Sequence, residues 1–173
     1  VVDFSLTVLP GETIGIVGES GCGKSTLIRT IMRLIPETAM VSADQLSYRQ
    51  QELLSLSDKD YRDKILWREI SLVPQSAMNS LNRVYRVGDQ ILEAIQTHSD
   101  MDKGEARDRV EKLFKGVGLQ PALTRNYAHE FSGGMRQRAM IAMSLALDPG
   151  LIIMDEPTTG LDVLVQERIL REL

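Results

Sequence analysis

Two kinds of hydrophobic pattern follow one another along this chain of 173 residues. Short apolar runs stand between polar turns at 13–17, 70–73 and 151–154. Runs of this length, rich in Ile and Val, are typical of strands that are buried on both faces of a parallel sheet. Between these runs, apolar side chains return every third or fourth residue, which predicts helices. The order of the elements therefore predicts an α/β fold on a mostly parallel sheet.

The beginning of the chain predicts an antiparallel strand pair. Apolar and polar residues alternate from Val2 to Val8, which is the period of a half-buried strand. Leu9–Glu12 has Pro and Gly at its centre, as tight turns do, and the apolar run 13–17 follows it. Further along, 45–48 is expected to be a short strand and 57–66 a brief helix.

Helical spacing dominates an insert that we expect at about 87–131. The apolar face of its first helix is formed by Val87, Ile91, Leu92 and Ile95. The residues Asp102 and Glu105 have the spacing of a capping box for a second helix. Gly118 is expected to stop that helix, because glycine readily takes the left-handed conformation found at helix ends.

A third helix is predicted at 134–147, with Ser132 as its N-cap. We expect the helical part of the protein to span about 87–147, inside a single domain that covers 1–173. Another helix is expected to begin near Val163.

Composition, net charge and cysteine content limit the classes of protein to which the chain can belong. Hydrophobic residues make up 43% of the chain and charged residues 25%, which is typical of a soluble globular domain. The net charge of −4 gives no reason to expect a nucleic-acid partner. Cys22 is the single cysteine, so no disulfide can form within the sequence. The chain starts on Val1 in a strand pattern and ends on Leu173 in a helical one, and we interpret it as a piece of a longer protein.

A phosphate-binding loop follows the apolar run 13–17. Its nine residues are Gly18, Glu19, Ser20, Gly21, Cys22, Gly23, Lys24, Ser25 and Thr26. They fit the pattern in which glycines let backbone N–H groups turn toward phosphates at the start of a helix. Lys24 is expected to reach the β- and γ-phosphates of a bound triphosphate, and the Ser25 hydroxyl to ligate Mg²⁺. The following helix is expected to extend to Ile35, before Pro36.

Two other stretches have residues suited to phosphate chemistry. Asp155 and Glu156 end the apolar run 151–154, where a carboxylate can act on Mg²⁺. Taken alone, this pair is also compatible with an acidic turn that caps the next helix. Ser132, Gly133 and Gly134 precede a helix and can expose N–H groups to an anion. The alternative there is an ordinary glycine turn with an N-cap.

The motifs together resemble the nucleotide-binding domain of ABC transporters. They are the phosphate loop, Gln75 after an apolar strand, Phe131–Arg138, and Leu151–Asp162, and they occur in this order. The resemblance covers essentially the whole chain. Three sequence features are similar to the branch that imports dipeptides and oligopeptides, and to its nickel-importing relatives. They are the residues at 79–82, the residues at 127–131, and Met135 within the signature motif Phe131–Arg138.

The resemblance implies a P-loop ATPase that works as a dimer. Asp155 would act on Mg²⁺, Glu156 would polarise the attacking water, and Gln75 would touch both Mg²⁺ and the water. The residues of the signature, Ser132 to Gly134, would contact ATP bound to the opposite protomer, with Asp162 at the dimer seam. A second ATP-binding subunit, transmembrane permease subunits and, indirectly, a solute-binding protein are the implied partners, at the cytoplasmic face of the membrane.

Several positions depart from this branch. Arg83 and Ala128 stand where the branch usually has proline, and Ser76-Ala77 replaces an acidic-Pro pair. The resemblance places the adenine-stacking aromatic before Val1 and the switch histidine after Leu173, since His98 and His129 precede Asp155. We therefore expect weak hydrolysis from these residues alone.

Two other classes of function share these motifs. One is a mechanical ATPase of the ABC type that acts on nucleic acid or ribosomes, and the other is an interaction module that binds ATP without turning it over. Long coiled-coil inserts or two tandem domains would favour the first, and Glu156 argues against the second.

Overall fold

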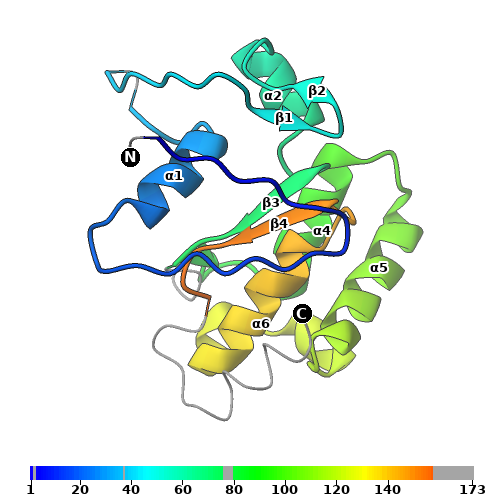
Figure 1. The fold of residues 1–173 in the computed structure, drawn as a ribbon. Coiled ribbons are helices and arrows are strands. Elements are labelled where there is room, and N and C mark those ends of the chain that lie inside the picture. The colour runs from blue at the N-terminus through cyan, green and yellow to red at the C-terminus, as the bar shows by residue number, and fades with distance from the viewer. Residues whose placement is uncertain (2, 37, 76–79, 158–173) are drawn as a thin grey trace. The chain divides into compact units, whose positions relative to one another are not determined.

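We describe the chain from a computed structural model, which places residues 1, 3–36, 38–75 and 80–157 (Figure 1). The chain forms two compact units, Val1–Leu54 and Ser55–Leu173, and each is described by itself. Among the described helices, none is long and apolar enough to cross a membrane.

The strand pair predicted at the beginning of the chain is not formed. Residues 3–17 run as a plain extended segment, dark blue in Figure 1, and the predicted turn is present, with the Glu12 amide 3.0 Å from the Leu9 carbonyl. Ile16 is 43% exposed and Val17 is 95% exposed. An alternating or apolar pattern becomes a strand only where a partner supplies ladder hydrogen bonds, and the described residues offer this segment no such ladder.

Helix α1 (Lys24–Ile31) begins where the sequence predicts but ends four residues before Ile35. Its last turn closes with hydrogen bonds from Arg33 N to Thr30 O (3.1 Å) and from Leu34 N to Arg29 O (2.7 Å). This is a Schellman motif, with Arg33 in the left-handed region at φ 51°. The Arg33 guanidinium donates to the Leu53 carbonyl at 2.6 Å, which helps hold a non-glycine residue in that conformation.

A hairpin that the sequence pattern did not predict follows in the same unit. Strands β1 (Ser47–Tyr48) and β2 (Gln51–Glu52) pair antiparallel, and β1 falls within the predicted strand 45–48. The two turn residues, Arg49 and Gln50, have φ of 46° and 67°. A two-residue turn of this kind usually has Asn and Gly, so its usual sequence signal is missing here.

The larger unit begins with α2 (Asp58–Lys64), capped by Ser57 as predicted, with the Asp60 amide donating to the Ser57 hydroxyl at 3.0 Å. A hydrogen bond from Lys64, 2.6 Å away, lowers the pKa of Asp60 and raises that of Lys64. Both side chains are exposed, so this pair contributes little to stability.

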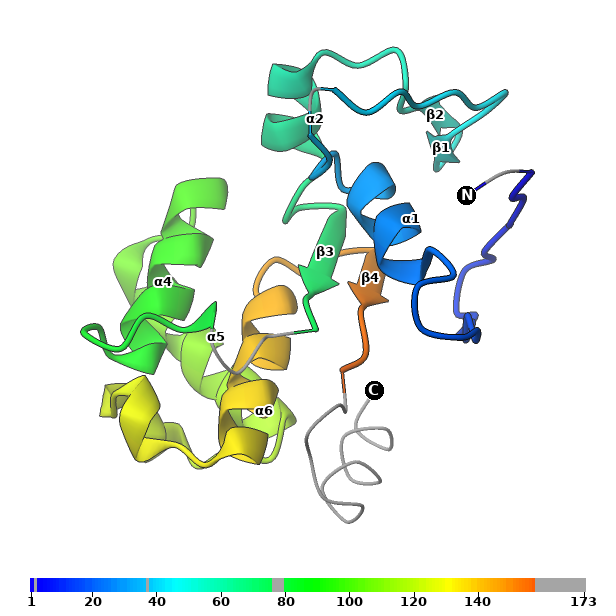
Figure 2. The ribbon, with the colours of Figure 1, turned by 90° about the vertical axis from the view of Figure 1, so that its left-hand side faces the viewer.

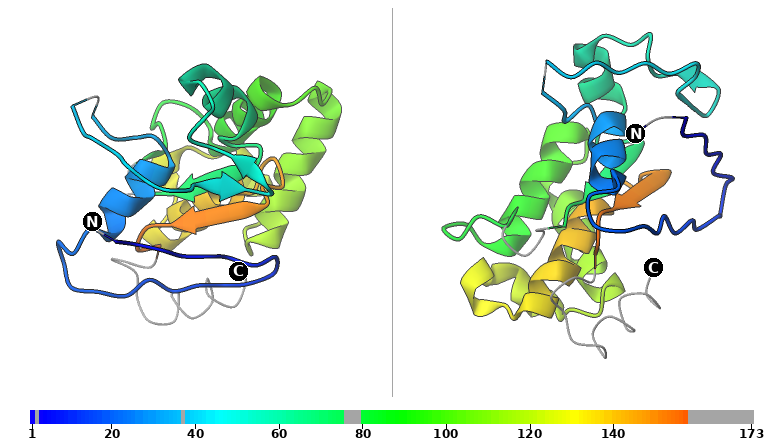
Figure 3. Two further views of the ribbon diagram at one scale, coloured as in Figure 1. Left: turned by 45° about the horizontal axis from the view of Figure 1, so that its top comes forward. Right: turned by 60° about the vertical axis from the view of Figure 1, so that its left-hand side comes forward.

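The sheet of this unit consists of β3 (Ile70–Val73) and β4 (Leu151–Met154), the two apolar runs. They pair in parallel with Ile70 opposite Leu151 and Val73 opposite Met154, and lie side by side in Figure 3. The ladder continues one residue further, with Asp155 N 2.9 Å from Val73 O. The predicted parallel α/β arrangement is thus confirmed, and it places the ends of both strands at one edge.

Three long helices lie together on one side of this strand pair (Figure 2). They are α4 (Val87–His98), α5 (Lys103–Gly116) and α6 (Gly133–Ser144), and the short 3₁₀ helices η1 (Pro121–Arg125) and η2 (Ala128–Glu130) connect α5 to α6. The predicted apolar face of α4 is buried. The rings of Phe114 and Phe131 pack edge to face, with their centroids 6.5 Å apart. Gly88 is required by packing, because a Cβ there would lie 2.6 Å from the Thr124 carbonyl.

The predicted helix ends of this part are also present. Asp102 and Glu105 form the reciprocal capping box of α5. Gly118 takes φ 68° and, with Leu119, closes α5 by a second Schellman motif. Ser132 caps α6, which ends at Ser144 rather than at 147.

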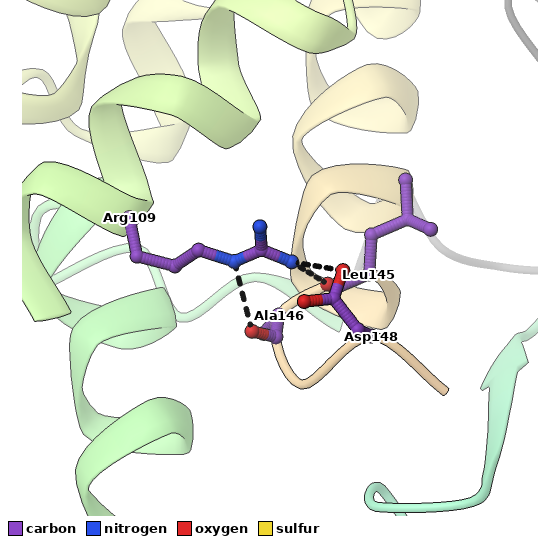
Figure 4. Close-up of polar contacts among 4 residues, drawn as sticks. All are labelled: Arg109, Leu145, Ala146 and Asp148. Carbon is purple, nitrogen blue, oxygen red and sulfur yellow. Dashed lines mark hydrogen bonds and ion pairs between the residues drawn. The ribbon is translucent and has the colours of Figure 1, made fainter. Parts of the chain in front are cut away.

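Arg109 of α5 closes the end of α6, as Figure 4 shows. Its Nη2 donates to Leu145 O at 3.0 Å and its Nε to Ala146 O at 3.3 Å, and the guanidinium also pairs with Asp148. Asp148 is 78% exposed, so the two carbonyl contacts are expected to contribute most of the stabilisation. Leu145 O also accepts from Asp148 N at 3.2 Å, so the guanidinium adds a second donor there and supplies a donor to Ala146 O just past the helix end.

We expect Arg109→Met to lower the free energy of unfolding by about 2 kcal/mol, because hydrogen bonds to a charged group are lost while the apolar stem is kept. Urea denaturation of the intact protein measures this. Arg107→Met is the matched control, since Arg107 is exposed on the same helix. Equal losses in the two variants would show that the cap on α6 does not stabilise the fold.

Candidate functional site

The phosphate loop leads directly into α1. Gly21 and Gly23 have φ of 83° and 104°, which residues with a Cβ rarely adopt. Gly23 is the N-cap of α1, and the first helical bond runs from Leu27 N to Gly23 O at 2.9 Å. In the first turn of any α-helix the N–H groups have no acceptor within the helix, which makes a helix N-terminus suited to binding an anion.

Lys24 folds back over this loop. Its Nζ donates to Gly18 O at 2.7 Å and to Glu19 O at 2.9 Å, and lies 3.6 Å from Cys22 Sγ. The lysine ammonium therefore binds the first two carbonyls of the loop. A Cβ on Gly18 would come 2.7 Å from Cys22 Sγ, so the cysteine side chain leaves no room for one there.

These features fit a triphosphate. Positive φ at two glycines is a backbone conformation found in anion-binding loops, the helix dipole is positive at this end, and the lysine supplies a full charge. Residues 13–17 pair with no other segment that the structure describes, so the loop and the helix are the parts of the predicted context that are present.

A second group of predicted residues meets at the edge of the β3–β4 sheet. Gln75, two residues after β3, donates from Nε2 to Glu156 Oε2 at 2.7 Å. Glu156 comes two residues after β4 and has φ 48°, which lets the chain turn sharply there. Residues 81 apart in sequence are thereby joined because their strands are neighbours. Asp155 lies beside them, half-buried.

The signature stretch begins α6. Ser132 Oγ accepts from Met135 N at 3.3 Å, and Gly133 and Gly134 form the first turn of the helix and are half-buried. This arrangement agrees with both readings of the stretch, the anion site and the glycine turn with an N-cap. Asp162 and the helix expected near Val163 lie outside the described residues.

Comparison with models of known protein families shows to which family this chain belongs. The family model described as ABC transporter matches residues 1–159. The chain belongs to the ABC transporter family. The resemblance drawn from the four ordered motifs is therefore confirmed.

The names of several curated relatives of this chain refer to peptide transport. A probable peptide ABC transporter ATP-binding protein, y4tR of Sinorhizobium fredii, is 46% identical over 167 residues, which are 95% of this chain and 50% of that protein. The dipeptide transport ATP-binding protein DppD of Escherichia coli is 44% identical over 172 residues, or 98% of this chain and 52% of DppD. The chain thus spans about half the length of the curated relatives that it matches.

Solved structures with a similar fold are ATP-binding cassettes. A dimeric cassette in a post-hydrolysis state, bound to ADP and Pi, aligns with a TM-score of 0.81 at 26% identity, covering 96% of this chain and 70% of that one. A dimeric bacterial ABC transporter cassette aligns with a TM-score of 0.78 at 27% identity. These likenesses confirm the predicted P-loop fold class of the ABC transporter chain.

The predicted metal ligands of this ABC transporter chain fit Mg²⁺ only in part. Among the described residues, the His, Cys, Asp and Glu side chains form no group of three that could hold a metal ion. Mg²⁺, however, usually keeps several waters and binds phosphate oxygens together with one or two protein groups. Ser25, in the unit Val1–Leu54, and Gln75 and Asp155, in the unit Ser55–Leu173, each carry a side-chain oxygen of the kind that Mg²⁺ prefers.

The direct contact between Gln75 and Glu156 is the feature that sequence reasoning missed. The resemblance gave each residue a role near the water, but it did not predict that one would donate to the other. The available signal was positional, because each residue follows an apolar run at the same distance and the two runs pair in register.

Nucleotide should protect Cys22 from alkylation. The thiol is exposed and lies beside the Lys24 ammonium, where bound phosphates would cover it. We expect iodoacetamide to label Cys22 several-fold more slowly with ATP present than without, as followed by mass spectrometry of the peptide. Adenosine, which has no phosphates, is the control and should protect little. Equal labelling rates with and without ATP would place Cys22 outside the site.

Proposed function

We propose that this protein binds Mg²⁺-ATP at residues 18–26 and hydrolyses it to power peptide import through a membrane permease. The names of the curated relatives support the solute class, and the dimeric cassettes with ADP and Pi support the chemistry. The observation on which the proposal chiefly rests is the hydrogen bond that joins Gln75 to Glu156 at the strand edge.

In the proposed mechanism, the loop N–H groups and Lys24 bind the β- and γ-phosphates and orient the terminal phosphoryl group. Glu156 accepts a hydrogen bond from the attacking water and turns its lone pair toward phosphorus. Gln75 holds the Glu156 carboxylate in place by the 2.7 Å hydrogen bond, so the water meets a fixed acceptor. Mg²⁺, held by Ser25 and through Asp155, would neutralise charge on the phosphate oxygens.

We further propose that two such subunits, identical or related, close on two ATP molecules. Ser132 and Gly134 of one subunit would then bind the γ-phosphate held by the other, using the first turn of α6. In this proposal residues 1–173 act as one ATP-binding domain, and 87–147 is its helical part. The intact protein would lie peripherally at the cytoplasmic face of the membrane, beside its permease and, indirectly, a solute-binding protein.

Transport by the reconstituted complex tests the solute. Intact protein and permease are placed in proteoliposomes with ATP on the cytoplasmic side, and uptake of a labelled dipeptide is compared with uptake of nickel ion. The proposal predicts ATP-dependent dipeptide uptake and no nickel uptake. Nickel uptake, or binding of the protein to ribosomes in place of the permease, would contradict it.

A further inference from the structure

Two aromatic rings meet between the end of α4 and the turn that leads into β3. The Trp67 indole stacks on the His98 imidazole, with the ring centroids 5.9 Å apart and the planes at 14°. Both side chains are half-buried, and both lie in the larger unit. We name this stack the aromatic clasp, because it joins a helix to the beginning of the sheet.

The backbone of Trp67 is strained. Its φ is 69°, in the left-handed region, where the side chain of a bulky residue crowds the following carbonyl. The turn that holds it there is closed by hydrogen bonds from Glu69 N and Ile70 N to Ile65 O, at 2.9 and 3.0 Å. Such conformations persist only where surrounding contacts support them, and they cluster at sites that switch between states. The strain at Trp67 therefore marks this turn as a candidate switch.

His98 is presented from the opposite side by a fixed helix end. It is the last residue of α4, and Ser99 after it bonds back to Ile95 O through its amide at 2.9 Å and its hydroxyl at 2.7 Å. Ile95 is fully buried in the core that the helices share. The imidazole therefore follows α4 and not the turn before β3, so a shift of β3 against α4 separates the two rings.

β3 connects the aromatic clasp to the proposed catalytic edge. At one end, Trp67 N donates at 2.9 Å to the carbonyl of Ile70, the first residue of β3. At the other end, Gln75 follows β3 by two residues and donates to Glu156. All four residues of β3 pair with β4, so the strand is expected to move as one piece. A shift of Gln75 is therefore passed along β3 to the turn that carries Trp67.

We propose that the aromatic clasp is closed in the nucleotide-free protein and opens when ATP binding shifts Gln75. Stacking favours the closed state and the strained backbone of Trp67 opposes it, so the two states are close enough in free energy for a ligand to shift the balance. This inference rests on the proposed function. A contact that opens on binding acts against ATP, so the aromatic clasp lowers ATP affinity and holds the nucleotide-free subunit in one conformation.

Removing the imidazole is expected to strengthen ATP binding. In titration calorimetry of the intact protein, we expect His98→Ala to bind ATP about fivefold more tightly than wild type, because the aromatic pair no longer opposes binding. His98→Phe keeps an aromatic face for the indole and should restore the wild-type affinity. His129→Ala is the matched control, since it also removes a histidine stacked on an aromatic ring, that of Tyr127, and its ATP affinity should equal that of wild type.

Trp67 itself reports whether the aromatic clasp opens. Its emission is taken as the difference between the fluorescence of the intact protein and that of the Trp67→Phe variant, so that any other tryptophan cancels. A stacked imidazole quenches indole emission. We therefore expect Mg²⁺ with an ATP analogue that is not hydrolysed to raise the Trp67 emission and shift it to longer wavelength. In His98→Ala the emission should already be high without nucleotide and should not change when the analogue binds.

The two measurements separate this inference from the function on which it rests. If wild type binds ATP but the Trp67 emission does not respond, the aromatic clasp does not open and the inference is overturned, while the proposed function stands. An ATP affinity of His98→Ala that is equal to or weaker than that of wild type would show a merely structural contact, with the same consequence. Failure of the wild-type protein to bind ATP would overturn both.

Discussion

Glu156→Gln is expected to slow phosphate release from Mg²⁺-ATP by about 10²- to 10³-fold, because a positioned general base contributes about that much to such a reaction. ATP affinity should stay within about twofold of wild type, since ATP in this account is bound by the loop and Lys24. The substitution is nearly isosteric, and its amide oxygen can still accept from Gln75 Nε2. A lower rate of phosphate release would therefore result from removal of the carboxylate, and not from disruption of the ends of β3 and β4.

Phosphate release and ATP affinity are measured on the same preparation of intact protein. Glu111→Gln is the control, because Glu111 is exposed on α5 and should behave as wild type. Gln75→Ala should fall between the two, since the carboxylate remains but loses its fixed orientation. A rate in Glu156→Gln within threefold of wild type would contradict the role given to this residue.

Lys24→Ala is expected to weaken ATP binding by at least about 30-fold. The ammonium gives charge-assisted hydrogen bonds to the phosphates, and losing such bonds typically costs about 2 kcal/mol or more. The loop itself also changes, since the ammonium now holds the carbonyls of Gly18 and Glu19. Titration calorimetry with ATP, ADP and AMP measures the effect, and the loss should be largest for ATP.

Lys59→Ala is the matched control, because Lys59 is an exposed lysine of α2 in the other unit. Its ATP affinity should equal that of wild type. If Lys24→Ala also bound ATP normally, the phosphate loop would not be the nucleotide site.

Local signals predicted the helical part of the fold well. The capping box at Asp102, the stop at Gly118 and the cap at Ser132 each depend on residues close in sequence, and each is present. The strands β3 and β4 were predicted from their apolar runs as strands buried on both faces. β3 is largely buried, whereas all four residues of β4 are half-buried.

Features that depend on distant partners were predicted less well. The run 13–17 is as apolar as β3, yet it forms no ladder in the part of the chain that the structure describes. The left-handed Arg33 that follows the end of α1 is held in part by its hydrogen bond to Leu53 O, 20 residues away, which no local pattern indicates. The β1–β2 turn uses Arg49 and Gln50, whose left-handed conformations are not favoured by their residue types.

The candidate site shows the same division. The phosphate loop was predicted from nine adjacent residues, because the positions of glycines and one lysine specify its backbone and charge. The contact of Gln75 with Glu156 joins two strand ends and could be reached only through the pairing of β3 with β4.

Turnover of ATP by the intact wild-type protein tests the central claim most directly. Phosphate release is followed with Mg²⁺-ATP and again with excess EDTA, beside a measurement of ATP binding. We expect steady phosphate release that requires Mg²⁺. Normal ATP binding with no phosphate release, in the presence of Mg²⁺ and the permease, would contradict it and show a module that binds ATP without hydrolysing it.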